Sequence, residues 1–146
     1  MPKRATNAVP TIPDSELDVL KALWNRGQGT VRELLEAIRS AGRDWSYATV
    51  ATLLDRLESK GLVASDRSEL AFVYRPLITE QEVCQRRIRG LVEKLYHGEP
   101  GLLVMHLLKT HPLGPDQALQ IRAMLDQMAR EDPAARPRIS QGGPEV

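Results

Sequence analysis

The sequence predicts a mainly α-helical protein with one small β-hairpin. Three observations support this fold class. Apolar residues recur at helical spacing along most of the chain, strand-like runs occur only between residues 62 and 76, and glycines and prolines separate the periodic segments. The chain has 146 residues, of which 42% are hydrophobic and 27% charged, so its composition is that of a globular protein.

The N-terminal region is predicted to begin as a flexible arm and to continue as a helix. Residues 1–13 contain three prolines and show no apolar period. We expect the first helix to begin near Ser15, with Asp14 or Ser15 as its N-cap, and to end at Gly27. Its apolar face consists of Leu17, Leu20, Leu23 and Trp24.

Two further helices follow, each with one apolar stripe. Thr30 and Glu33 match a capping box, which predicts a second helix ending near Gly42. A third helix is expected from about Ser46 to Lys60. The stripe of the second helix consists of Val31, Leu34, Leu35 and Ile38, and that of the third consists of Val50, Leu53, Leu54 and Leu57.

The apolar period changes after the third helix. Residues 62–66 and 71–75 are short strand-like runs around 67–70, which predicts a hairpin with Pro76 at the end of its second strand. Three helices followed by a hairpin within residues 14–78 is the order of a winged helix-turn-helix.

The remaining chain is predicted to be helical up to residue 130. A capping box at Thr79 and Glu82 opens a helix to about His97, residues 102–109 form a short apolar helix, and Pro115 starts the last one. Residues 131–146 contain three prolines and two glycines and are expected to form a disordered tail.

Three amphipathic helices bury one another poorly without a partner. We therefore expect residues 79–130 to be a helical dimerisation domain and the protein to be a homodimer, although the same apolar residues would also suit a core within one chain. The candidate dimerisation residues are Ile88, Leu91, Leu95, Leu103, Leu107, Ile121, Leu125 and Met128.

The third helix and the hairpin carry the candidate functional residues. In a winged helix-turn-helix the third helix enters the major groove of DNA and the hairpin lies beside the phosphate backbone. Small side chains allow close approach, threonines offer a hydroxyl and a methyl group to base edges, and basic side chains reach phosphates. The candidates on the third helix are Tyr47, Ala48, Thr49, Ala51, Thr52, Arg56 and Lys60, and those on the hairpin are Arg67 and Arg75.

The charge balance leaves a second function open. The chain has 20 basic and 19 acidic residues, so the basic excess typical of nucleic-acid-binding proteins is missing overall. The alternative is a winged-helix module that binds another protein and no DNA. A basic flank on the third helix would favour DNA, and an apolar flank would favour a protein partner.

Catalytic, metal and membrane functions have weak support. No Ser-His-Asp order, phosphate-binding loop or HExxH motif occurs, so we expect no catalytic residue and no cofactor. A metal site built from Cys84 and the three histidines is a third possibility, but a lone cysteine is more often a packed side chain. The longest apolar run covers residues 102–105, so we expect a cytoplasmic protein with no membrane span.

Several segments bring a known family into consideration. The run Leu17–Trp24 resembles the first helix of the penicillinase-repressor family of winged-helix regulators, and Thr30–Leu34 resembles its second helix. Tyr47–Leu57, followed by Lys60–Val63, is similar to its recognition helix and strand entry. The resemblance continues to about Met128. The family includes the β-lactamase, methicillin-resistance and copper-transport repressors.

The resemblance implies a repressor that binds a double-stranded DNA operator as a homodimer, on pseudo-palindromic sites with TACA/TGTA-like half-sites. Ala48, Thr49, Ala51 and Thr52 fall where members read bases, so direct polar readout would rest on the two threonines. Arg56, Lys60 and Arg67 fall where members touch the backbone.

Two signals release family members from DNA, and this chain departs from the sequence pattern of each. Some members are cut by a signalling protease at an Asn-Phe bond, whose counterpart here is Met105–His106. The copper-responsive members have cysteines near the C-terminus, and this chain has none there.

Overall fold

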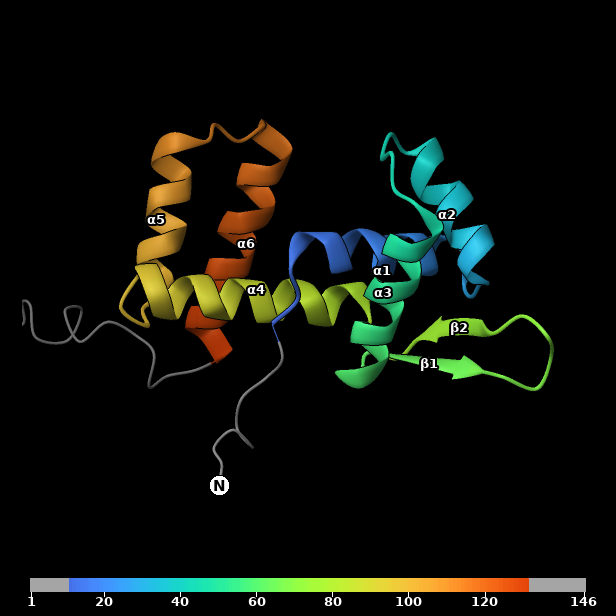
Figure 1. Ribbon diagram of the computed structural model, residues 1–146. Helices are drawn as coiled ribbons and strands as arrows, with labels where there is room; N and C mark the ends of the chain where they lie inside the picture. The colour runs from blue at the N-terminus through green and yellow to red at the C-terminus, as the bar shows by residue number, and fades with distance from the viewer. Residues whose placement is uncertain (1–10, 132–146) are drawn as a thin grey trace, which may run out of the picture. The chain divides into compact units, whose positions relative to one another are not determined.

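A computed structural model describes residues 11–131 and confirms the predicted fold class (Figure 1). The elements are α1 (Asp14–Arg26), α2 (Val31–Ser40), α3 (Tyr47–Ser59), β1 (Val63–Asp66), β2 (Val73–Pro76), α4 (Glu80–Leu95), α5 (Pro100–Thr110) and α6 (Pro115–Glu131). The chain forms two compact units, which divide within α4 between Leu91 and Val92. The sequence predicts this division at residue 78, before the start of α4. None of the helices in the described part of the chain is long and apolar enough to cross a membrane.

The ends of the helices are formed by local side chains. The Thr30 N–H donates to Glu33 Oε1 (2.9 Å) and the Glu33 N–H donates to Thr30 Oγ1 (3.1 Å), which is the predicted capping box. Thr79 and Glu82 form the same pair at the start of α4. The N-cap predicted for α1 was wrong, because Pro13 occupies that position in an extended conformation and Asp14 is already helical.

The first helices form a common core. All four residues of each predicted stripe in α2 and α3 are buried. In α1, Leu20 and Leu23 are buried as predicted, and the burial of Val19 and Ala22 follows from the contacts of this helix with α2, α3 and β2. Leu17 and Trp24 pack against the edge of this core, so the stripe predicted for α1 was too narrow.

The hairpin is held to the helices through the backbone. Gly29, between α1 and α2, donates its N–H to Tyr74 O (3.0 Å) and accepts from the Tyr74 N–H (2.8 Å). Tyr74 lies on β2 opposite Ser65 of β1 and is buried. A Cβ at position 29 would lie 3.3 Å from the Leu34 side chain, so glycine suits this close approach. The hairpin therefore has a fixed position relative to α2.

The last residues of the expected flexible arm are part of the packed first unit. Residues 1–10 and 132–146 lie outside the described residues, so most of the arm and nearly all of the expected tail are not described. Ile12 is buried in the core of the first unit, and Glu131 is the last residue of α6. The packed unit therefore begins before Asp14, the first residue of the predicted domain.

The second unit contains two helices with little buried surface. His97 (φ 55°) and Gly98 (φ 76°) turn the chain after α4. The helix predicted over residues 102–109 begins earlier, because Pro100 is the first residue of α5, where its missing N–H is not needed. Pro115 starts α6 as predicted. Neither α5 nor α6 has a buried residue.

Substitutions on the two faces of α3 should differ in their effect on the free energy of unfolding. Replacing the fully buried Leu54 (Leu54→Ala) should lower the free energy of unfolding by about 2–5 kcal/mol, because it leaves a cavity. Thr52→Ala, on the exposed face, should change it by less than about 0.5 kcal/mol. Urea denaturation of both variants measures the difference. Equal losses would contradict the assignment of the two faces.

Candidate nucleic-acid interface

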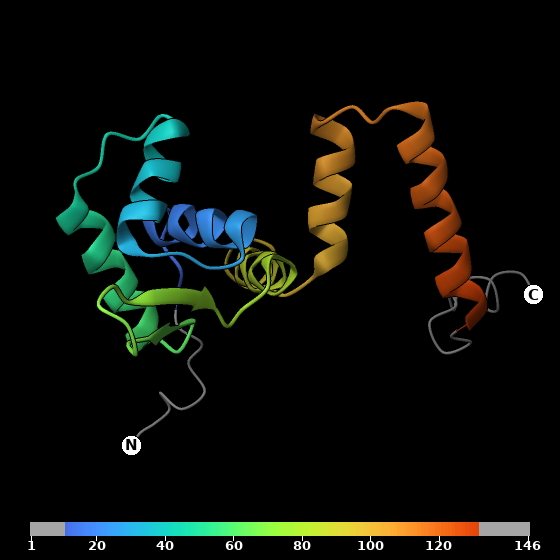
Figure 2. The same ribbon diagram turned by 90° about the vertical axis from the view of Figure 1, so that its right-hand side faces the viewer.

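The outward face of α3 brings the predicted base-reading residues together. Because Val50, Leu53, Leu54 and Leu57 point into the core, the helical positions between them face solvent. Figure 2 shows α3, in green, with one side turned away from α1 and α2. The predicted residues that are exposed on this surface are Tyr47, Ala48, Thr49, Thr52 and Arg56, while Ala51 is partly buried at its edge. Asp55 and Ser59 are exposed on the same surface. The surface is small and polar apart from Tyr47, which is 50% exposed.

The start of α3 is held by a hydroxyl cap. Ser46 Oγ accepts a hydrogen bond from the Thr49 N–H (3.1 Å) and lies 3.0 Å from Thr49 Oγ1. This cap satisfies one of the free N–H groups at the helix start and restrains the Thr49 side chain. Thr49 is therefore presented to solvent from a fixed position.

Arginines flank the start of α3, and the sequence reasoning missed them. The Arg32 guanidinium lies 5.7 Å from the centre of the Tyr47 ring, and that of Arg43 lies 5.5 Å from the Trp45 ring. Arg39 Nε donates to Trp45 O (3.0 Å). The signal in the sequence was that Arg39 and Arg43 lie on either side of Gly42, before the third helix. Arg43 Nη2 also lies 2.7 Å from Asp18 Oδ2, so part of its charge is neutralised. This flank of α3 carries three arginines, which favours a DNA-binding surface over an apolar protein-binding one.

The hairpin carries the second group of basic residues. Arg67 donates to Ser65 Oγ (2.9 Å) and Glu58 Oε1 (3.1 Å), and its guanidinium lies 4.5 Å from the centre of the Phe72 ring. The hydrogen bond from Ser65, together with the charge of Arg67, lowers the pKa of the Glu58 carboxyl below its usual value. Arg75 is exposed on β2. The hairpin is thus joined to the last turns of α3 through a carboxylate that neutralises part of the Arg67 charge.

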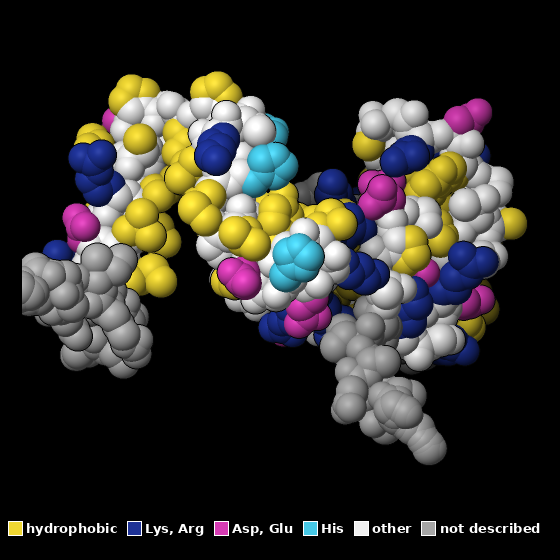
Figure 3. Space-filling model, turned by 90° about the vertical axis from the view of Figure 1, so that its left-hand side faces the viewer, with side chains coloured by type: hydrophobic (Ala, Val, Ile, Leu, Met, Phe, Trp, Pro, Cys, Tyr) yellow, Lys and Arg dark blue, Asp and Glu magenta, His cyan; other side chains and the backbone are white. Residues whose placement is uncertain are grey.

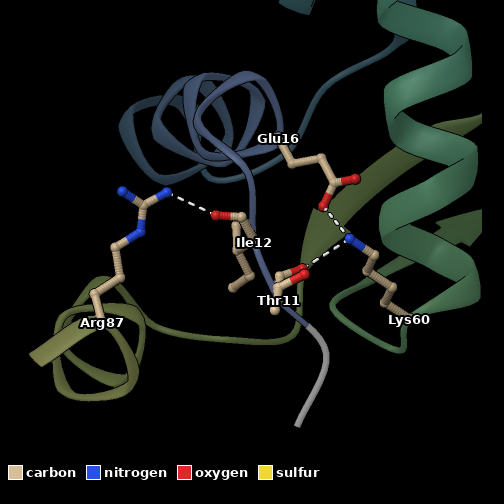
Figure 4. Close-up of polar contacts among 5 residues, drawn as sticks. All are labelled: Thr11, Ile12, Glu16, Lys60 and Arg87. Carbon is tan, nitrogen blue, oxygen red and sulfur yellow. Dashed lines mark hydrogen bonds and ion pairs between the residues drawn. The ribbon is translucent and has the colours of Figure 1, made fainter. Parts of the chain in front are cut away.

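Lys60 has a different role from the predicted phosphate contact. Its Nζ lies 2.6 Å from Glu16 Oε1 and donates to Thr11 O (2.8 Å) (Figure 4). Glu16 is only 1% exposed, so its carboxylate requires this cation. Lys60 follows Leu57 by three residues, which places its side chain along the buried stripe and toward α1. The ammonium group is therefore engaged within the protein.

The helices of the second unit expose a large apolar surface (Figure 3). Leu108, Leu113, Ile121 and Leu125 line a groove between α5 and α6. Of the predicted dimerisation residues, six are exposed and two, Leu103 and Ile121, are partly buried. The exposed six are Ile88, Leu91, Leu95, Leu107, Leu125 and Met128. Exposed apolar residues of the second unit that the prediction omitted are Val104, Met105, Leu108, Leu113, Leu119 and Met124.

The residues considered for metal binding are dispersed. Within residues 11–131 no group of three or more His, Cys, Asp or Glu side chains could hold a metal ion. Cys84 is exposed, so its predicted packing in the core was wrong. Tyr96 Oη lies 2.6 Å from His106 Nδ1, and Thr110 Oγ1 lies 2.8 Å from His111 Nδ1. These two histidines form local hydrogen bonds.

A three-helix unit with a hydroxyl-bearing outward face on its third helix, an adjoining hairpin and arginines on both sides defines a winged helix-turn-helix DNA-binding transcriptional regulator. The chain belongs to the penicillinase repressor family, whose model matches residues 12–127.

Two relatives match nearly their whole length. The methicillin resistance regulatory protein MecI of Mammaliicoccus sciuri is 26% identical over 83% of this chain and 98% of that protein. The penicillinase repressor of Bacillus licheniformis is 26% identical over 82% of this chain and 92% of that protein.

Two solved structures each cover about half of the chain. The solution structure of the DNA-binding domain of the repressor BlaI is 32% identical and covers 51% of this chain and 90% of that one, with a TM-score of 0.46. The monomeric form of Bacillus licheniformis BlaI in complex with the blaP half-operator is 33% identical, with the same coverage and a TM-score of 0.44.

The contact between Lys60 and Glu16 predicts an effect on stability. Lys60→Met should lower the free energy of unfolding by about 2 kcal/mol or more, because it leaves the Glu16 carboxylate buried without a cation. Lys21→Met removes the same charge from an exposed position on α1 and should have little effect. Urea denaturation compares the two variants. If Lys60→Met lowers the free energy of unfolding no more than Lys21→Met does, Lys60 does not stabilise the buried Glu16 carboxylate.

Proposed function

We propose that the protein is a repressor that binds its operator as a homodimer, with α3 of each subunit in a major groove and each hairpin beside the phosphate backbone. The observation that carries this proposal is the outward face of α3, which is small and polar and has arginines on both flanks. Membership of the penicillinase repressor family supports it, and relatives that match along most of the chain are named as repressors.

Different residues would position the protein and read the sequence. Thr49 and Thr52 are proposed to contact base edges, while Ala48 and Ala51 allow close approach or contact thymine methyl groups. Arg56 on α3 would contact phosphates. The remaining phosphate contacts are proposed for Arg39, Arg43, Arg67 and Arg75. Lys60 is left out of this set because it neutralises Glu16.

A homodimer would cover the apolar surface of α5 and α6 together with Ile88, Leu91 and Leu95 of α4. Two-fold symmetry in the protein requires a pseudo-palindromic operator, for which the family suggests TACA/TGTA-like half-sites. A protein with this task acts where the chromosome is, which in a bacterium is the cytoplasm. Cleavage by a signalling protease at Met105–His106 would require α5 to unfold locally, because this bond lies inside the helix.

DNA binding should depend differently on α3 and on the hairpin. On sites recovered by genomic footprinting, Thr52→Ala should cost about 1–3 kcal/mol of specific binding and relax the preference at one base pair. Arg67→Ala should weaken binding to all sequences and reduce the slope of log affinity against log salt by about one. Gel shifts with nonspecific competitor at several salt concentrations measure both effects.

Lys21→Ala is the control for this experiment, because it removes a positive charge from α1 and should leave the salt slope unchanged. An unchanged slope in Arg67→Ala would exclude the hairpin from the interface. If the wild-type protein recovers no enriched sites, DNA binding itself is excluded.

The oligomeric state should depend on the apolar surface of the second unit. Leu125→Lys places a charge in the groove between α5 and α6 and should shift the protein from dimer to monomer in sedimentation experiments. Gln117→Lys makes the same charge change at an exposed polar position of α6 and should leave the dimer intact. Dissociation by both variants, or by neither, would contradict the proposed interface.

A further inference from the structure

The first turns of α4 have little apolar contact with the winged-helix unit. Among the α4 residues that belong to this unit (80–91), Val83 is the only buried one, at 3% exposure. Val83 belongs to the same core as Ile12 and Ile78. A helix that is held by one apolar side chain can pivot about that point, so its direction requires a second contact.

Arg87 provides the second contact, one helical turn after Val83 and on the same face. Its Nη2 donates to Ile12 O (2.6 Å) (Figure 4). Its Nη1 lies 3.0 Å from Asp14 Oδ1. The bond to the Ile12 carbonyl is the better shielded of the two from solvent, because it is partly buried. The Asp14 side chain is 84% exposed, so that ion pair contributes little.

The segment that Arg87 binds is itself fixed at its other end. Thr11 O accepts a hydrogen bond from Lys60, which lies just after the last turn of α3. Residues 11–14 therefore connect the end of α3 to α4 through Lys60 and Arg87. Because Glu16 holds Lys60 in place, this connection does not depend on exposed ion pairs alone.

We propose that Arg87 is a positioning residue for operator spacing, which it sets by fixing the direction in which α4 leaves the winged-helix unit. This inference rests on the proposed binding of a homodimer to two half-sites. The chain reaches the helices that would dimerise through α4, so the freedom of α4 limits the freedom of each recognition helix. Adding 1 bp between half-sites moves one of them by about 3.4 Å and rotates it by about 35°. A pivoting α4 would tolerate this change, and a fixed α4 would not.

The test compares two variants of the full-length protein that lose the same charge from the same helix. Arg87→Met removes the bonds to Ile12 and Asp14 but keeps an unbranched side chain. Arg89→Met is the matched control, because Arg89 is an exposed residue of α4 two positions later. Affinities are measured for a half-site duplex and for operators whose spacer is lengthened or shortened by 1 or 2 bp.

Wild type and Arg89→Met should prefer one spacer strongly. In Arg87→Met the ratio between the best spacer and its 1-bp neighbours should fall by about threefold or more, while half-site affinity matches that of Arg89→Met. Arg87→Lys, which keeps a charged donor for the Ile12 carbonyl, should recover most of the preference. Thermal unfolding checks that all three variants are folded.

Two results would overturn the inference while leaving the proposed function intact. One is a spacer preference in Arg87→Met equal to that of Arg89→Met. The other is a selective loss of half-site affinity in Arg87→Met, which would place the effect at the DNA surface or in folding. If Arg87→Met does not fold, the test rests on Arg87→Lys. A folded Arg87→Lys variant that lacks the spacer preference of the wild type overturns the inference as well. Absence of wild-type binding to any site would instead overturn the proposed function.

Discussion

The burial of one stripe on α3 is the constraint on which the other features of the first unit depend. Val50, Leu53, Leu54 and Leu57 are 0–4% exposed, and together they fix the rotation of the helix about its own axis. Turning α3 by one residue, about 100°, would expose these side chains and bury hydroxyl groups without partners. The polar face is therefore directed outward by the core. The backbone bridge between Gly29 and Tyr74 then places the hairpin beside this face.

The fold was predictable where its signals are local in sequence. The stripes of α2 and α3 and the capping boxes at Thr30 and Thr79 each depend on residues within a few turns of one another, and the structure confirms them. The burial of Ile12 and the ion pair of Lys60 depend on contacts between distant segments, and Glu16 lies 44 residues before its partner. No periodic pattern reports such a contact, so Lys60 resembled any solvent-facing cation at the end of a helix.

The candidate site was predictable in part, for the same reason. The helical spacing of the apolar residues in α3 identified Thr49 and Thr52 as outward-facing. Arg39 and Arg43 have no such periodic signal, so nothing in the sequence separates them from ordinary surface charges. Their relation to α3 comes from their contacts with Trp45, which lies two residues before this helix. The contacts of these residues with bases and phosphates, and the pairing of α5 and α6 between subunits, remain predictions.

The carboxylates beside the arginines have a consequence for how the protein would search a chromosome. Glu58 neutralises part of the Arg67 charge, and the whole chain has a net charge of only +1. Attachment to random DNA depends on the number of phosphates that are neutralised, so the pairing of Arg67 with Glu58 should weaken it relative to an unpaired arginine at this position. Fewer copies would then be retained on the vast excess of unrelated sequence. A small cellular pool could keep an operator occupied and still respond quickly when its concentration changes.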